Sequence, residues 1–140
     1  MLLKALSEFG RCDVTVDGES MKPFIRSGDV ATIATIPAHP RLGQVAAFFN
    51  NDQLIMHRIT RRKKIPDGSW DLSVYGDSSP RSGGRVASSQ VIGVVLYLNR
   101  NHRKHSLWFR SPFRLLAVPI GFLMRFWVRC KYVFKQEKLA

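Results

Sequence analysis

Cysteine is scarce in this sequence, and the positions of the two cysteines argue against a disulfide-rich scaffold and against a structural zinc site. Cys12 and Cys130 lie near opposite ends of the chain, without a CxxC pair or an evenly spaced framework. Disulfide scaffolds and zinc sites both need several closely spaced cysteines. We therefore expect two free thiols and no metal cluster, and no motif indicates another cofactor.

Long hydrophobic runs are missing as well. The longest uncharged stretch of the C-terminal part, Leu115 to Met124, has ten residues, whereas a helix needs roughly 20 apolar residues to span a bilayer. The N-terminal MLLKALSEFG has too short an apolar run for a secretory signal and no small-residue cleavage site. We expect a cytoplasmic protein, or one that binds a membrane peripherally.

Acidic residues are few. The chain has 10 Asp and Glu and 22 Lys and Arg, which gives a net charge of +12. Residues 1–99 hold 12 basic and 9 acidic residues, a balance of +3, whereas residues 100–140 hold 10 and 1, a balance of +9. A basic segment favours anionic partners, either phospholipid headgroups or nucleic acid. No helix-turn-helix, zinc-finger or RNP pattern accompanies the charge, so we expect no nucleic-acid partner.

What the sequence does contain is typical of a globular domain with a hydrophobic core, at 140 residues and 45% hydrophobic content. In the first hundred residues, alternating or β-rich runs are separated by Gly, Pro, Asn and Asp turn signals. The pattern predicts a mostly β domain of six short strands: Val14–Val16, Val30–Ile36, Gln44–Phe49, Gln53–Arg62, Trp70–Tyr75 and Val91–Leu98.

After Asn99 the character of the chain changes. Residues 100–105 are a polar, basic connector, and residues 106–134 are aromatic, aliphatic and rich in arginine. We therefore predict two parts, a β domain over residues 1–99 and a basic, amphipathic helical appendage over residues 100–140.

The appendage has the pattern of a helix at a membrane surface. At about 100° per residue, its arginines fall on one face: Arg110, Arg114, Arg125 and Arg129. Apolar side chains fill the other faces: Leu115, Leu116, Ile120, Phe122, Leu123, Met124, Phe126 and Trp127. This favours contact between residues 106–134 and lipid headgroups. The alternative is a helix packed on the β core or on a second chain. Pro119 predicts a kink or two short helices.

The segment DGESMKPFIRSGD, residues 17–29, frames one serine tightly. Gly18 can adopt positive φ and Pro23 restricts φ soon after Ser20, so the segment predicts a bend that presents a hydroxyl. The alternative is that Ser20 only N-caps a helical turn beginning at Met21. A serine hydroxyl needs a nearby base to act as a nucleophile.

His57 is the candidate base. Alternation in the predicted strand Gln53–Arg62 places it on the face of Ile55 and Ile59, an apolar setting that would keep the imidazole neutral. The alternative is a core histidine that bonds a backbone carbonyl. The other histidines, at positions 39, 102 and 105, fall in loops or in the basic connector, where solvation explains them.

Asp77 follows the predicted strand Trp70–Tyr75, in the sequence Gly-Asp-Ser-Ser-Pro. An aspartate there can bond one ring nitrogen of His57 and leave the other nitrogen to face Ser20. The alternative is a turn aspartate that bonds its own backbone.

Taken together, these segments resemble the successive boxes of type I signal peptidases and of the related self-cleaving repressor peptidases. The resemblance covers roughly residues 14–97, and its motifs are Gly18-Glu-Ser20-Met21-Lys-Pro23, Ser27-Gly28-Asp29, His57-Arg58 and Gly76-Asp77. Bacterial members usually have Lys-Arg where this chain has His57-Arg58, and the His-Arg pair is similar to the endoplasmic-reticulum and archaeal type.

The resemblance implies a serine endopeptidase with Ser20 as nucleophile, His57 as general base and Asp77 as the residue that orients the base. It also implies a mostly β sandwich or partial barrel with an exposed cleft. The implied substrate is an extended peptide with small residues before the cleaved bond. The residues expected to contact it are Gly18, Met21, Pro23 and Ile55.

Three departures from the family's pattern shape these expectations. Gly18 stands where many signal peptidases have a serine, so the oxyanion would rely on main-chain N–H groups such as that of Ser20. Gly83 and Gly84 lie where the endoplasmic-reticulum type has a second acidic residue. The usual N-terminal membrane anchor is missing, and the basic C-terminal part is expected to replace it.

Other functions remain open at this point. Lys63 and Lys64 cannot replace His57, because they lie about 20 Å further along an extended strand at ~3.3 Å per residue. A non-catalytic peptide-binding or membrane-tethering module on the same fold is the main alternative to a peptidase. A self-cleaving regulator is disfavoured, because the residues before Ser20 are too few for a DNA-binding domain and a linker.

Overall fold

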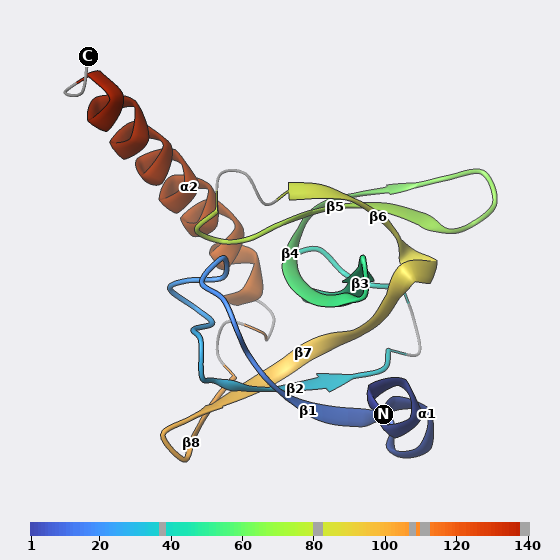
Figure 1. The fold of residues 1–140 in the computed structure, drawn as a ribbon. Coiled ribbons are helices and arrows are strands. Elements are labelled where there is room, and N and C mark those ends of the chain that lie inside the picture. The colour runs from blue at the N-terminus through green and yellow to red at the C-terminus, as the bar shows by residue number, and fades with distance from the viewer. Residues whose placement is uncertain (37–38, 80–82, 107–108, 110–112, 138–140) are drawn as a thin grey trace.

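The computed structural model describes residues 1–36, 39–79, 83–106, 109 and 113–137, leaving aside the side chains of residues 113–114 and 128–137. It confirms a mostly β fold, built on one eight-stranded antiparallel sheet, with a short helix near the N-terminus and a long helix near the C-terminus (Figure 1).

The elements follow one another as α1 (Leu2–Phe9), β1 (Arg11–Thr15), β2 (Val30–Ala34), β3 (Val45–Asn50), β4 (Gln53–Lys64), β5 (Trp70–Tyr75), β6 (Gly83–Ala87), a 3-10 turn (Ser88–Gln90), β7 (Val91–Arg100), β8 (Arg103–His105) and α2 (Phe113–Glu137). In the sheet the strand order is β1-β2-β7-β3-β4-β5-β6, and β8 pairs with β7. The long strand β7 therefore joins the first two strands to the later ones.

All six predicted strands are present, and β5 has the predicted bounds. The structure also contains α1, β6 and β8, which the sequence pattern does not predict. The two glycines at the start of β6 are typical of a turn, but their backbones pair with Tyr75 and Val74 of β5.

The sheet bends so strongly that it encloses two separate cores. Register shifts occur in β2, β3 and β4, and such bulges let strands turn sharply. In Figure 1, β4, β5 and β6 curl round β3, while β1, β2 and β7 lie together in the other part. The first core contains Leu6, Val16, Met21, Phe24, Ile25, Ala31, Ile33, Val45, Ala47, Val95, Leu98, Phe109 and Ala117. The second core, inside the curl, contains Ala46, Phe48, Ile59, Leu72, Val74 and Val86.

The strands β3 and β4 separate the two cores, so each has buried side chains on both faces. In β3, Val45 and Ala47 face the first core, whereas Ala46 and Phe48 face the second. In β4, Leu54 and Met56 pack against the first core and Ile55 against the second. Because side chains alternate along a strand, His57 and Arg58 also point to opposite sides.

The chain after Asn99 takes part in the β fold. β7 continues through Asn99 to Arg100 and then pairs with β8. Phe109 and Ala117 are both buried in the first core, beside residues from the Ser20 segment. The first turns of α2 thus pack on the β core, which was the alternative to a freely exposed helix.

The helix α2 is continuous from Phe113 to Glu137, with Pro119 inside it, so the expectation of two short helices was wrong. Of the four arginines predicted to share a face, Arg125 is the one whose side chain is among the described residues. The predicted face therefore lies mostly outside them. Figure 1 shows the later turns of α2 projecting away from the sheet. Among the described residues, no helix is both long enough and apolar enough to cross a membrane.

Cys12, on β1, is a free thiol as expected. Cys130 is one of the residues whose side chains lie outside the description.

Candidate active site

Ser20 lies in the long connection between β1 and β2, which is closed at its base by main-chain hydrogen bonds. The N–H of Val16 donates to the carbonyl of Asp29 (2.8 Å), and the N–H of Gly28 donates to the carbonyl of Val16 (2.9 Å). Gly28 has φ of 90°, a conformation that favours glycine. The Ser-Gly-Asp motif therefore closes the loop that carries the serine.

A partly buried ion pair holds the same loop to the end of β7. Arg100 donates to both carboxylate oxygens of Asp29 (2.8 and 2.6 Å), and the N–H of Arg26 donates to Asp29 Oδ2 (2.8 Å). Burial raises the pKa of the Asp29 carboxyl, but the Arg100 and Arg26 hydrogen bonds outweigh it and lower the pKa overall. The loop is thereby fixed to the C-terminal end of β7.

Within the loop, apolar side chains on either side of the bend turn inward. The N–H groups of Phe24 and Ile25 donate to the carbonyl of Met21 (3.1 and 3.0 Å), which forms a tight turn. Met21 and Ile25 are buried in the first core, whereas Ser20 is half-buried. Burial of Met21 thus places the preceding serine at the edge of the core, with its hydroxyl toward β4.

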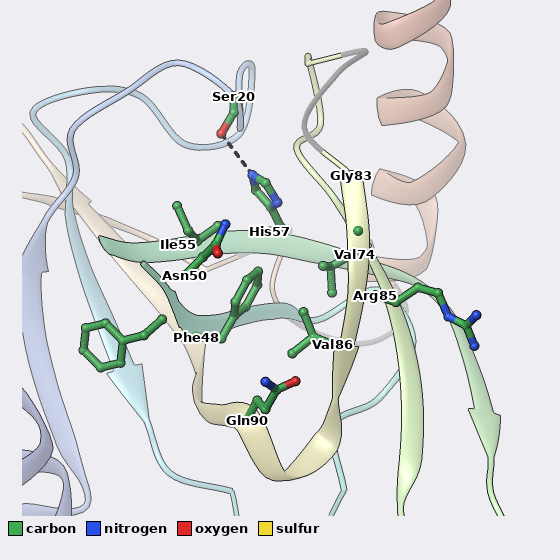
Figure 2. A pocket seen from close by; sticks show the side chains of 12 residues that line it. Ser20, Phe48, Asn50, Ile55, His57, Val74, Gly83, Arg85, Val86 and Gln90 are labelled. Atoms are coloured by element: carbon green, nitrogen blue, oxygen red, sulfur yellow. Dashed lines mark hydrogen bonds between the residues drawn. The ribbon is translucent and has the colours of Figure 1, made fainter. Parts of the chain in front are cut away.

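His57 approaches this hydroxyl from β4. Its Nε2 lies 3.5 Å from Ser20 Oγ (Figure 2). Its ring packs edge-on against Phe48, with 6.2 Å between ring centroids. Burial lowers the pKa of His57 from 6.5 to about 4, because the charged imidazolium loses its hydration. The imidazole is therefore neutral at physiological pH and able to accept a proton.

The structure bears on two alternatives that the sequence left open, Ser20 as an N-cap and His57 as a core histidine. Among the described residues, Ser20 Oγ forms no N-capping hydrogen bond, and its partner is His57. His57 is likewise not a core histidine bonded to a backbone carbonyl. The predicted meeting of hydroxyl and imidazole is present.

The predicted contact between Asp77 and His57 is not formed, and this expectation needs correction. Asp77 is fully buried, and its carboxylate accepts hydrogen bonds from Arg58 Nε (2.9 and 3.1 Å) and Arg58 Nη2 (2.8 Å). Burial raises the pKa of the Asp77 carboxyl, and the guanidinium of Arg58 opposes that rise.

The physical reason is the alternation of side chains along β4. His57 faces the second core, and the neighbouring Arg58 faces the first, where its guanidinium stacks 5.0 Å from the ring centroid of Phe24. Asp77 reaches β4 on the Arg58 side of the strand. A buried guanidinium needs a carboxylate more than a neutral imidazole does, because an unpaired buried charge is very costly.

Sequence reasoning overlooked Ser78, which ties the Asp77 turn to the loop that carries Ser20. Its N–H donates to the carbonyl of Ser20 (2.9 Å), and its hydroxyl donates to the carbonyl of Glu19 (2.8 Å). The turn therefore connects β4 to the Ser20 loop. Asp77 binds Arg58, the neighbour of His57 in β4, and Ser78 binds the backbone of Ser20. The sequence signal was present, since Ser78 belongs to the quoted Gly-Asp-Ser-Ser-Pro turn.

The Ser20–His57 pair lies between two cavities. The smaller has a volume of about 70 Å³ and is lined by Gly18, Met21 and Ile55, together with Ser20 and His57. The larger has a volume of about 540 Å³ and extends over the second core on the other side of the pair (Figure 2). Ile55 lines both cavities.

Of the residues expected to contact substrate, Gly18, Met21 and Ile55 line these cavities and Pro23 does not. Pro23 follows a cis peptide bond and lines a separate cavity with Phe24 and Arg100. The smaller cavity is the one that matches the predicted preference for small side chains.

The helix α2 packs on the Asp77 turn through its smallest residue. A Cβ atom at Gly121 would lie 3.0 Å from Asp77 Oδ1 and 3.3 Å from Asp77 Cα. One turn later, Arg125 Nη1 donates to the carbonyl of Gly76 (3.1 Å), and its guanidinium lies 5.1 Å from the ring centroid of Tyr75. The C-terminal helix therefore supports the turn that holds the loop of Ser20.

Comparisons of the chain with protein-family models, with curated proteins and with solved structures find no match.

Proposed function

We propose that the chain is a serine endopeptidase of the signal-peptidase type, which cleaves peptides through an acyl-enzyme. The observation that carries the proposal is the 3.5 Å approach of Ser20 Oγ to Nε2 of a buried, neutral histidine, at the junction of two open cavities. Hydrogen bonds between catalytic groups are often long without substrate and shorten in the complex. The resemblance of the GESMKP segment to the signal-peptidase box supports the same reaction.

In the proposed first half-reaction, His57 Nε2 accepts the Ser20 hydroxyl proton while Oγ forms a bond to the substrate carbonyl carbon. The carbonyl π electrons move to oxygen, where the main-chain N–H of Ser20 stabilises the negative charge. When the intermediate collapses, the C–N bond breaks and the imidazolium of His57 gives its proton to the leaving amine.

In the second half-reaction, water attacks the ester. His57 accepts a proton from the water while the water oxygen bonds to the acyl carbon. The bond between that carbon and Ser20 Oγ then breaks, and the imidazolium of His57 returns the proton to Ser20 Oγ. This mechanism uses a serine and a histidine. Packing against Phe48 orients the imidazole, and no hydrogen bond from His57 to Asp77 is required.

The direct test measures cleavage of leader-type peptides by the wild-type protein, Ser20→Ala and His57→Ala. We expect a loss of at least about a hundredfold in either variant, in the range of general acid–base contributions. His39→Ala is the matched control, because His39 is exposed and lies beside Trp70, away from Ser20. Equal turnover in all four proteins would end the proposal.

A second measurement separates a peptidase from a non-catalytic peptide-binding module. A serine-directed acylating probe should add its mass to the wild-type protein and not to Ser20→Ala. The non-catalytic module is favoured if Ser20→Ala and wild type bind leader peptides equally and neither is acylated.

For the partner of α2, we propose an anionic membrane surface. The face of α2 opposite Ala117 and Gly121 is apolar and exposed, with 62% exposure at Phe122, 64% at Leu123 and 61% at Phe126. The segment of residues 100–140 that contains it has a net charge of +9. Exposed apolar side chains on a basic helix suit the boundary between lipid headgroups and acyl chains.

Flotation with vesicles of phosphatidylcholine and phosphatidylglycerol tests this partner. The variant Leu123→Gln/Phe126→Gln should bind at least about tenfold less, since each buried large apolar side chain contributes about 1.5–3 kcal/mol. Phe9→Gln/Leu96→Gln is the control, because those exposed side chains lie on α1 and β7. Equal flotation of both double variants would exclude the α2 face as the membrane contact.

A further inference from the structure

The larger cavity beside Ser20 and His57 lies on the concave face of the curled sheet. Its floor consists of side chains that belong to the second core or pack against it: Phe48, Ile55, Val74 and Val86. Figure 2 shows these side chains below the imidazole of His57, with β6 along one side. The volume of about 540 Å³ is within the range of about 300–1,000 Å³ that is usual for specific ligand sites.

A missing side chain on β6 creates part of this space. Gly84 pairs with Val74 and shares the concave face with Val86. A Cβ atom at Gly84 would meet no atom within 4 Å. At Gly83, on the opposite face, a Cβ atom would lie 1.9 Å from Tyr75. Close packing therefore requires glycine at position 83, whereas at position 84 glycine leaves open space above the apolar floor, in a cavity that Asn50, Arg85 and Gln90 also line.

The strand β6 also has a free side that a peptide can use. Among the residues that the structure describes, it is a terminal strand in the sheet order and pairs with β5 alone. Extended peptides commonly bind by adding to such an edge, while their alternate side chains fill neighbouring pockets. The concave face beside β6 is therefore suited to an extended segment that inserts one side chain.

The chemistry of the Ser20–His57 pair decides which half of a substrate lies there. This step rests on the proposed peptidase function. The acyl half becomes bonded to Ser20 Oγ, beside Gly18 and Met21, where the cavity has a volume of only about 70 Å³. The leaving amine must receive its proton from His57 Nε2. His57 projects onto the face that carries the larger cavity, so the leaving half extends in that direction.

We propose that the larger cavity binds a large apolar side chain, aromatic or branched aliphatic, from the first residues after the cleaved bond. The enzyme would then read both sides of the bond. It would accept only small side chains before the bond and prefer a large apolar one after it.

The test uses peptides with Ala before the cleaved bond and Phe placed in turn at each of the three positions after it. An all-Ala peptide is the reference. We expect one Phe position to raise kcat/KM by about tenfold or more, since differences in apolar side chains within a pocket change rates by about 10–200-fold. Gly84→Leu should remove most of that preference, because Gly84 lines the cavity, an added Cβ atom there meets no atom within 4 Å, and the rest of the leucine side chain would occupy the space for Phe.

Ser73→Leu is the matched control, because it adds the same side chain to β5 on the opposite face of the sheet, away from the larger cavity. It should keep the Phe preference. Circular dichroism and thermal unfolding establish that both variants are folded.

A binding arm separates failure of this inference from failure of the proposed function. Dissociation constants of the Phe and all-Ala peptides are measured with Ser20→Ala and with Ser20→Ala/Gly84→Leu. Tighter binding of one Phe peptide to Ser20→Ala, lost in the double variant, supports the cavity even if wild type cleaves nothing. Equal binding of all peptides would overturn the inference, and so would a requirement for the large residue before the bond.

Discussion

His57 and Arg58 are neighbours in one strand, yet their side chains have different surroundings. His57 packs against an aromatic ring, and Arg58 forms an ion pair. The imidazole packs against Phe48 and stays neutral, since burial lowers its pKa to about 4. The guanidinium of Arg58 is paired with the carboxylate of Asp77. One residue is therefore kept available for proton transfer, and the other holds a carboxylate that sequence reasoning had assigned to the first.

The lowered pKa of His57 leads to a prediction about pH. The general base acts only when it is neutral, so activity is present above the folded pKa and is lost as the pH falls through it. We expect kcat/KM for a cleaved leader peptide to decline with an inflection near pH 4 instead of 6.5. An inflection near 6.5 would show that the imidazole is more hydrated than the structure indicates.

The ion pair leads to a prediction about stability. Asp77→Asn should lower the free energy of unfolding by about 3–5 kcal/mol, because it removes the carboxylate charge that pairs with the buried Arg58 guanidinium. Arg58→Met/Asp77→Leu should recover much of that loss, since an apolar pair replaces both charges. Urea denaturation of the three proteins measures both effects. An Asp77→Asn protein with unchanged stability would contradict the structural role.

At the scale of elements, the site is assembled by contacts between segments that are distant in the sequence. The β1–β2 connection supplies Ser20, β4 supplies His57, and the turn after β5 joins them through Ser78 and Asp77. The helix α2 lies against that turn at Gly121. A change in α2 is therefore expected to reach the loop of Ser20.

Substitution at Gly121 tests this connection. In an exposed helix, replacing Gly by a better helix former stabilises by about 0.8–1 kcal/mol. Here Gly121→Leu should destabilise by about 1–3 kcal/mol, because the added atoms meet Asp77, which its ion pair holds in place. Val118→Leu adds bulk elsewhere on α2 and is the control. Thermal unfolding decides the sign, and a gain in stability at Gly121 would refute the close contact.

On the scale of the whole molecule, the C-terminal part completes the β fold. Arg100 holds the Ser20 loop through Asp29, and Phe109 and Ala117 fill the first core. The exposed apolar face of α2 thus belongs to a segment that is structurally required. Attachment to a membrane and organisation of the site would then depend on the same helix.

Two truncations test this arrangement. A chain that ends at Asn99 should lose cooperative unfolding, because it lacks Arg100, Phe109 and Ala117 and exposes the first core. A chain that ends at Trp127 keeps all three residues and should unfold cooperatively, which circular dichroism during heating measures. Cooperative unfolding of the shorter chain would mean that residues 1–99 fold independently.

Local pattern was sufficient for most strands and for choosing Ser20 and His57 as a candidate pair, which the structure brings to 3.5 Å. Alternation and turn residues predicted β5 with its observed bounds and placed His57 on the apolar face of β4. The framing of Ser20 by glycine and proline predicted a presented hydroxyl. These features depend on neighbours within a few residues, so the sequence alone carries them.

Features that depend on competition between distant groups could not be predicted in this way. The strand β6 begins with two glycines and forms because β5 supplies its hydrogen bonds.

The sequence by itself determined a mostly β chain, a presented serine, a histidine in an apolar setting and an amphipathic, basic C-terminal segment. These features depend on periodicity and turn chemistry, which are local. Tertiary structure alone decided that Asp77 bonds Arg58 instead of His57, since a buried guanidinium competes for the carboxylate more strongly than an imidazole. It also decided that α2 supports the site, because only packing brings Gly121 against Asp77.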